Sequence, residues 1–277
     1  MKDTEAAAAG VDRGGTWTRL SCVNSRGTEL RGTRFPTSKL DLLIARLEKE
    51  FKKLKLEAGL PLVIATRGAF SKKWKRDFLF KAARGRLNLL DVISDAEAAH
   101  FAAFGGKAGL LLIAGTGAVA FYRDSTDRMV KTGGHNPAGG DPGSGRWIGR
   151  QYLKKLKKTL AGLSHGQTAA YAAALIAAAG EKAGWQRELA AHAQNNLAIL
   201  IAKSLKNFPR TKKIKVALTG GLIKNKFFRE GLIKMARERV PSKLIFTALK
   251  TTAQTAAAHL ALIASTNHSP GARAKKL

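Results

Sequence analysis

The 277-residue sequence has a single cysteine, Cys22, and few acidic residues. One thiol excludes a disulfide framework, an iron–sulfur cluster held within one chain and a zinc site built from cysteines. No apolar run approaches the roughly 20 residues that a membrane-spanning helix needs. The first residues, "MKDTEAAAAG", carry acids where a secretion signal carries bases. These absences predict a cytoplasmic protein with a buried thiol and without a membrane partner.

The shortage of acids leaves a large positive charge. Asp and Glu number 19 against 49 Lys and Arg, which gives a formal net charge of +30. Such a charge attracts anions, among them nucleotides, phosphorylated sugars and RNA. The bases are scattered along the chain, however, and no aromatic-bearing RNA-binding motif accompanies them. Non-specific binding of nucleic acid therefore stays open, and the charge alone names no partner.

Apolar residues make up 45% of the chain, enough for substantial cores, and they follow one plan twice. Residues 6–34 predict three short strands joined by glycine turns, and helices then alternate with buried strands up to residue 104. The first of these helices is expected over 38–59, with Ser38 as its N-cap and Gly59 as its end. From residue 110 the strand, turn and helix pattern begins again.

This repetition predicts an α/β protein with two duplicated domains, each a mixed sheet flanked by helices, and a cleft between them. The expected boundaries are 1–104 for the first domain and 105–251 for the second. A last helix over about 252–266 is expected to pack back on the first domain. Residues 267–277 are expected to form a flexible tail.

Glycine-rich turns follow strands in both halves. One spans residues 12–16, a second spans 115–117, and a glycine pair at 220–221 ends a later buried strand. Glycine lets backbone N–H groups approach an anion closely. A strand-end carboxylate such as Asp12 can hold Mg²⁺ beside phosphates, usually through water. For the first turn taken alone, a plain hairpin with a solvated acid is the alternative, and each of the three motifs is weak by itself.

In this order the turns resemble those of the sugar kinase/actin/Hsp70 ATPase superfamily. Within it the chain resembles the BadF/BadG/BcrA/BcrD ATPase family, in its N-acetylglucosamine-kinase-like branch. The resemblance rests on "GVDRGGTWTRL", "SDAEAAHFAAFGG", "LLLIAGTGAVAF", "GGDPGSGRWIGRQYL" and "ALTGGLIKN", which reach from near the N-terminus to about residue 225. It implies two ribonuclease H-like domains with an ATP cleft between them.

The resemblance also implies roles for individual residues. The phosphates of ATP would contact Gly14, Gly15, Thr16, Gly115, Thr116 and Gly117, the adenosine would contact Gly220 and Gly221, and Asp12 would lie near Mg²⁺. Asp95 matches the base that takes the proton of the sugar hydroxyl, which phosphoryl transfer requires together with positioning and charge neutralisation. Asp141 matches an acid that contacts the sugar, and His135 lies in the same loop within expected reach.

Each of these polar residues has a structural alternative. Asp95 could cap the helix that it begins, Asp141 could form a turn beside Pro142, and His135 could simply be exposed. Glu97 is expected to support the helix dipole from the first turn of the Asp95 helix.

The chain departs from the family pattern at three positions. Arg13 replaces a glycine of the first loop, Ala118 replaces a serine after the second, and Pro142 replaces a glutamate. The expected function is ATP-dependent phosphorylation of a sugar hydroxyl, with an amino sugar such as N-acetylglucosamine or glucosamine as acceptor. The alternatives are a BadF-type ATPase without a sugar acceptor and a non-catalytic nucleotide- or nucleic-acid-binding protein on the same fold. The resemblance also allows a homodimer.

Overall fold

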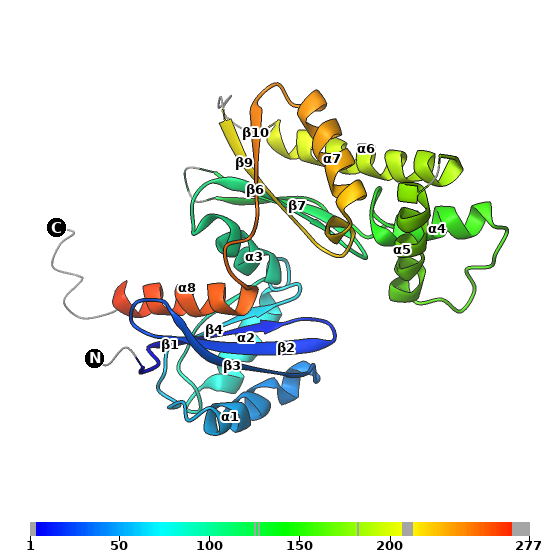
Figure 1. The fold of residues 1–277 in the computed structure, drawn as a ribbon. Helices are drawn as coiled ribbons and strands as arrows, with labels where there is room; N and C mark the ends of the chain where they lie inside the picture. Colours follow the sequence, from blue (N-terminus) through cyan, green and yellow to red (C-terminus); the bar gives the residue numbers. More distant parts are fainter. Residues whose placement is uncertain (1–3, 125, 127, 182, 207–212, 268–277) are drawn as a thin grey trace. The chain divides into compact units, whose positions relative to one another are not determined.

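The computed structural model describes residues 4–124, 126, 128–181, 183–206 and 213–267. The chain divides into two compact units, unit 1 with Met1–Gly105 and Lys250–Leu277, and unit 2 with Gly106–Leu249 (Figure 1). Each unit holds a five-stranded mixed sheet with helices, which confirms the predicted α/β class and its duplication. The expected tail lies outside the described residues from residue 268 onward.

The sheet of unit 1 has the strand order β3-β2-β1-β4-β5. β2 pairs antiparallel with both of its neighbours, whereas β1, β4 and β5 run parallel to one another. Every residue of β4 is buried, as expected for a parallel strand covered on both faces. The strands are β1 (Ala8–Arg13), β2 (Trp17–Val23), β3 (Glu29–Pro36), β4 (Leu62–Thr66) and β5 (Leu89–Ile93).

Helices cover both faces of this sheet. One face packs its apolar side chains against α1 (Leu43–Lys53) and α2 (Lys73–Ala83). The other face packs against α3 (Asp95–Phe104) and α8 (Ala253–Asn267), which returns to unit 1 from the far end of the chain (Figure 1).

The predicted bounds of the first helix, 38–59, are wrong at both ends. A short 3₁₀ turn (Leu40–Leu42) precedes α1, and the carbonyl of Ser38 accepts a hydrogen bond from Arg13 (2.6 Å) in place of starting a helix. At the other end Lys55 has φ of 51°, and Leu56 N–H donates to the Phe51 carbonyl (2.9 Å). This C-terminal turn buries Leu56 in the core, a common way for a helix to end.

Helix α8 lies directly on β1, and Gly10 makes this possible. A Cβ atom at Gly10 would lie 2.1 Å from the backbone nitrogen of Ala258 and 2.2 Å from the carbonyl oxygen of Gln254. The hydroxyl of Thr255 donates to Glu29 (2.7 Å), which fixes the same helix to the start of β3. These contacts make α8 an integral part of unit 1.

The sheet of unit 2 repeats this topology, with the order β10-β9-β6-β7-β8. β6 takes the place of β1, with an antiparallel partner on one side and a parallel partner on the other. The strands are β6 (Gly109–Ala114), β7 (Ala118–Arg123), β8 (Met129–Gly133), β9 (Lys213–Thr219) and β10 (Lys243–Thr247). The helices are α4 (Gly145–Lys155), α5 (His165–Glu181), α6 (Trp185–Leu205) and α7 (Lys226–Arg239), with a 3₁₀ turn at Leu222–Lys224.

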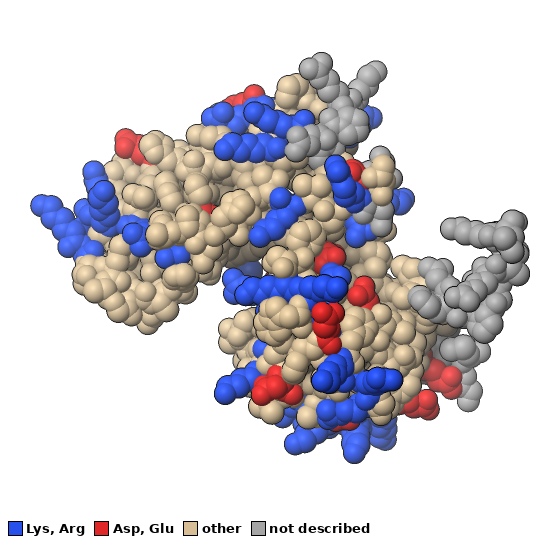
Figure 2. Space-filling view, turned by 180° about the vertical axis from the view of Figure 1, so that it is seen from behind, with Lys and Arg blue, Asp and Glu red and all other residues tan. Residues whose placement is uncertain are grey.

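Lys and Arg side chains are spread over the face of the molecule in Figure 2, in line with their scatter in the sequence. Within the described part of the chain, no helix has the length and apolar character needed to cross a membrane. Cys22 is a buried free thiol in β2, as predicted, and its burial raises the pKa of the thiol. A high pKa keeps the sulfur protonated and unreactive.

Candidate active site

The first glycine turn connects β1 to β2 and is held from its base. Gly14 N–H donates to the Trp17 carbonyl (3.1 Å) and Thr37 N–H donates to the Thr16 carbonyl (2.9 Å). The hydroxyl of Thr37 also donates to the carbonyl of Gly14 (3.1 Å). Gly15 and Thr16 at the tip remain exposed. The turn is thus fixed in shape while its tip stays accessible to a ligand.

Asp12 and Asp95 lie at the same edge of the unit 1 sheet. Asp12 is half-buried and accepts a hydrogen bond from Arg19 on the neighbouring strand (3.3 Å). Burial raises the pKa of the Asp12 carboxyl, Arg19 opposes this shift, and the negative charge of Asp95 adds to it. The structure therefore brings together the predicted metal-binding acid and the predicted catalytic base.

Asp95 begins α3, but it does not cap that helix. Ser94 is the N-cap, because its hydroxyl accepts the N–H of Glu97 (3.1 Å) while the Glu97 carboxylate accepts the N–H of Ser94 (2.7 Å). This reciprocal pair satisfies the first turn, and it gives Glu97 a capping role in addition to dipole support. Asp95 uses Oδ1 to accept the N–H of Ala96 (3.0 Å), which leaves Oδ2 for another partner. The capping alternative for Asp95 is therefore wrong.

The second glycine turn, in unit 2, is fixed by the start of α4. Gly115 N–H donates to the Gly117 carbonyl (2.9 Å) within the turn. The first N–H groups of α4, those of Gly145 and Arg146, donate to the carbonyls of Gly115 (2.7 Å) and Thr116 (3.1 Å). The side chain of Thr116 stays exposed. The turn and the helix start thus form one rigid element.

Asp141 adds a buried carboxylate to this element. Its side chain accepts the N–H of Ala118 through Oδ2 (3.1 Å) and the N–H of Asn136 through Oδ1 (2.9 Å). Arg146, which is buried and was not singled out from the sequence, donates to the side chain of Asn136 (3.0 Å). His135 is exposed in the same loop. Asp141 does more than form a turn, because it ties the 135–141 loop to the strand that follows the glycine turn.

The two glycines after β9 have different roles: Gly220 is required by the backbone geometry, and Gly221 lines a pocket. Gly220 has φ of +108°, and a Cβ there would lie 2.2 Å from the carbonyl oxygen of Ala114. Any side chain at this position would be strained and would clash with β6. Gly221 has ordinary backbone angles and open space around it, and it lines a pocket.

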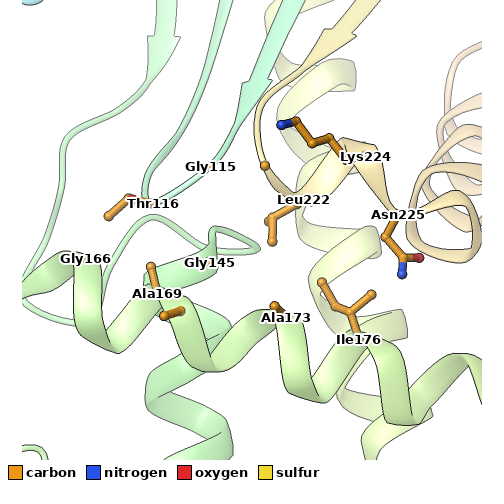
Figure 3. Close-up of a pocket in the computed structure, with 12 residues that line it drawn as sticks. Gly115, Thr116, Gly145, Gly166, Ala169, Ala173, Ile176, Leu222, Lys224 and Asn225 are labelled. Carbon is orange, nitrogen blue, oxygen red and sulfur yellow. The ribbon is translucent and has the colours of Figure 1, made fainter. Parts of the chain in front are cut away.

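This pocket has a volume of about 720 Å³. The second glycine turn, the start of α4 and one face of α5 enclose it together with the segment after β9 (Figure 3). The α5 residues Ala169, Ala173 and Ile176 point toward Leu222 across the pocket. Its lining residues are Gly115, Thr116, Gly145, Gly166, Ala169, Ala170, Ala173, Ile176, Gly221, Leu222, Lys224 and Asn225.

The α5 face was not recognised from the sequence as part of a site. The spacing of residues 169, 173 and 176 places them on one side of a helix, which is also the pattern of an ordinary core face. Asn225 was missed too, although its position before an amphipathic helix marks it as an N-cap. Its Oδ1 accepts the N–H of Phe228 (3.0 Å), so its NH₂ group is left to donate.

Comparisons with known proteins give the chain a family. The family model described as the BadF/BadG/BcrA/BcrD ATPase family matches residues 9–258. No curated protein sequence matches the chain.

Solved structures show the same fold at low sequence identity. A protein from Chromobacterium violaceum assigned as an N-acetylglucosamine kinase has a TM-score of 0.69 and 22% identity, and the match covers 92% of this chain and 98% of that one. A protein from Listeria monocytogenes assigned as an N-acetylmannosamine kinase has a TM-score of 0.68 and 14% identity over 94% and 99% of the two chains. The ROK hexokinase from Thermus thermophilus has a TM-score of 0.64 and 19% identity over 92% and 97%. Because the family model spans nearly the whole chain and the fold agrees with it, the chain belongs to the BadF/BadG/BcrA/BcrD ATPase family.

Proposed function

We propose that this protein is an ATP-dependent kinase that phosphorylates a hydroxyl of a sugar, with Asp95 as the general base. The position of Asp95 carries the proposal. The residue lies two positions after the end of the parallel strand β5, beside the half-buried Asp12, and is not used as a helix cap. Its Oδ2 is available to take a hydroxyl proton, which is the one proton transfer that phosphoryl transfer requires.

The proposed ATP contacts divide between the glycine turns and the unit 2 pocket. The N–H groups of Gly15, Thr16 and Thr116, at the exposed tips of the two turns, would bind phosphate oxygens, as glycine turns do elsewhere. Gly14 and Gly115 use their own N–H groups to hold the turns in shape. The pocket beside Gly221 has an apolar wall of small side chains on α5 and suits a flat base. The amide of Asn225 at its edge supplies a hydrogen-bond donor.

Asp12 fits a magnesium ion that is bound mainly through ATP. Among the described residues, no group of three or more His, Cys, Asp or Glu side chains could hold a metal by itself. Mg²⁺ in kinases keeps several waters and takes one or two carboxylates together with phosphate oxygens. The mutual repulsion of Asp12 and Asp95 also favours a nearby cation. When bound, the ion would neutralise charge on the transferring phosphate.

Asp141 and His135 remain the proposed sugar contacts in unit 2. Both carboxylate oxygens of Asp141 already accept a backbone N–H. A carboxylate oxygen has two lone pairs, so each can accept a further bond from a sugar hydroxyl. N-acetylglucosamine and glucosamine are the acceptors to test first, because the structural relatives include proteins assigned to N-acetylated amino sugars.

The experiment follows ADP release with N-acetylglucosamine, glucosamine, neutral hexoses and no acceptor. Asp95→Asn is compared with Ser94→Ala, which removes the true helix cap but keeps the carboxylate. General-base catalysis contributes about 10²- to 10⁴-fold, so Asp95→Asn should lose that much in kcat with little loss of stability. Ser94→Ala should do the reverse, losing about 1 kcal/mol of stability while keeping most of its activity.

The outcomes separate the candidate functions. Acceptor-dependent ADP release that Asp95→Asn abolishes supports the kinase. ADP release that no acceptor accelerates favours an ATPase without a sugar acceptor. Nucleotide binding without any ADP release, in the native protein as well as in Asp95→Asn, favours a non-catalytic binding protein.

A further inference from the structure

Three parallel strands of unit 1 end together beside Asp95. Arg13, the last residue of β1, is paired with Thr66, the last residue of β4. Ala65 of β4 is in turn paired with Ile93 of β5, two residues before Asp95. Ligands of open α/β sheets bind at the carboxyl ends of the strands. This edge, defined here as the ends of β1, β4 and β5, is therefore the expected place for a substrate.

Basic side chains gather at this edge. The ammonium of Lys75, on α2, donates to the carbonyl of Arg67 just after β4 (2.7 Å). The guanidinium of Arg13 donates to the carbonyl of Ser38 (2.6 Å) and is half-buried. Lys72 also approaches from the segment before α2, with its Cδ 3.9 Å from the position of a Cβ at Gly68.

The effect of neighbouring charges on the pKa of Lys75 shows that these basic side chains lie close to one another. Burial lowers the pKa of Lys75, and the positive charges of Lys72, Arg13 and Arg67 lower it further, while Asp95 opposes them. Lys75 thus lies among three other cations and one carboxylate.

Within the described chain, Asp95 is the one carboxylate near these four cations that is not already paired with another base. The other acids at the edge are engaged, because Asp12 pairs with Arg19 and Glu97 pairs with Arg76. Among the described residues, none of Arg13, Arg67, Lys72 and Lys75 forms an ion pair. Four cations held close together with a single carboxylate repel one another, and an anionic ligand relieves that repulsion.

Polar atoms at the same edge also lack partners. Arg13 Nε, Ser38 Oγ and Thr66 Oγ1 are buried, and no other atom of the described structure hydrogen-bonds to them. A buried polar atom without a partner costs free energy unless a ligand or water satisfies it. The edge therefore offers both unpaired charge and unused hydrogen-bonding groups.

We propose that the sugar acceptor of this protein carries an acidic group, a carboxylate or a phosphate, which Lys75 and Arg13 bind beside Asp95. The inference rests on the proposed kinase function and specifies its substrate class. An acceptor with an ammonium group, such as glucosamine, is disfavoured by the same charges, and a neutral N-acetylated sugar gains nothing from them. The acid is recognised separately from the hydroxyl that Asp95 deprotonates.

The test uses two acceptor pairs whose acidic group lies at different carbons, glucose with glucuronic acid (C6) and N-acetylglucosamine with its 1-phosphate (C1). Whichever hydroxyl accepts the phosphoryl group is therefore retained in the acidic member of at least one pair. Kinetics of ADP release are measured with the full chain and with Lys75→Met. Lys73→Met is the matched control, because Lys73 is exposed on the same helix and does not belong to the cation cluster. A charge-assisted hydrogen bond corresponds to about a 10- to 100-fold effect on kcat/KM.

The native protein and Lys73→Met should favour the acidic member of a pair by at least about tenfold. Lys75→Met should lose this preference because its kcat/KM falls with the acidic acceptors and stays unchanged with the neutral ones. A native preference for the neutral member in both pairs would overturn the inference and leave the kinase function standing. An equal loss with every acceptor, together with a higher KM for ATP, would also overturn it, because Lys75 would then serve the phosphoryl donor.

Direct binding separates this inference from the proposed function. If no acceptor accelerates ADP release, the kinase proposal fails, and calorimetry with glucuronic acid and N-acetylglucosamine 1-phosphate decides whether the anion site exists. Binding that Lys75→Met removes and Lys73→Met keeps supports the site. Equal binding by the two variants, or no binding to the native protein, overturns it.

Discussion

Adjacent glycines at the end of β9 should respond in opposite ways to the same substitution. Gly220→Ala places a side chain at φ of +108° and a Cβ 2.2 Å from the carbonyl oxygen of Ala114. Gly221→Ala places a Cβ in open space beside the pocket, at ordinary backbone angles. The first change tests how β9 approaches β6, and the second tests where adenosine binds.

The expected magnitudes follow from these geometries. At Gly220 the strained backbone costs about 1–3 kcal/mol. The forced displacement from Ala114 costs about 1–3 kcal/mol more. The sum of about 2–6 kcal/mol corresponds to a fall in Tm of roughly 6–20 °C for a unit of this size. Gly221→Ala should instead gain about 0.4–1 kcal/mol, because alanine loses less freedom on folding.

The assay is thermal unfolding with and without ATP. ATP should raise the Tm of the native protein, since a ligand that binds only the folded state stabilises it. Gly221→Ala should melt at or slightly above the native Tm but lose most of the ATP-dependent rise. Gly59→Ala, which also enters open space but lies in unit 1 outside the pocket, should keep it. An undiminished ATP-dependent rise in Gly221→Ala would refute the placement of adenosine, and a native Tm in Gly220→Ala would refute the strand-end geometry.

Two further changes address unit 2. Asp141→Asn leaves one of two backbone N–H groups, that of Ala118 or that of Asn136, facing an NH₂ group in place of an acceptor. Unfolding in urea should therefore show a loss of about 1–3 kcal/mol, and a native midpoint would contradict the role given to this carboxylate. Burial, with a smaller contribution from Asp124, raises the pKa of Tyr122 from 10.0 to about 12. Because the folded state retains this proton longer than the unfolded state, the contribution of Tyr122 to stability is complete below pH 10 and is lost as pH rises toward 12. The urea midpoint should therefore decrease more between pH 9 and pH 11.5 in the native protein than in Tyr122→Phe. An equal decrease in both proteins would exclude this titration.

Much of the fold could be predicted because its signals are local. Glycine turns between alternating strands, and buried apolar runs between amphipathic segments, define both sheets and their duplication. The bounds of α1 could not be predicted in this way. The segment before it is held by a hydrogen bond from Arg13 to the carbonyl of Ser38, two residues that lie 25 positions apart in the sequence. Its C-terminus depends on Lys55 adopting a positive φ, which lysine rarely does.

In the candidate site, too, the features that local sequence marks could be predicted, and those that depend on contacts between distant residues could not. Motif residues such as Asp95 and the 115–117 turn could be identified because family patterns mark them. The competition between Asp95 and Ser94 for the capping role could be decided only from side-chain contacts, since either residue type caps helices well. The α5 wall of the pocket and the cations around Lys75 come from separate elements, and nothing in the local sequence connects them.

The return of α8 to the first unit has a consequence for synthesis on the ribosome. Ala8, Val63 and Ile93 are made early, but the helix that covers them, with Ala257 and Ala261, emerges only after the whole of unit 2. Unit 2 is contiguous in the chain and can complete its core as soon as Leu249 has emerged. The nascent N-terminal half must therefore wait with one apolar face uncovered, a state in which chains become substrates for chaperones. The order of maturation is the reverse of the order of translation.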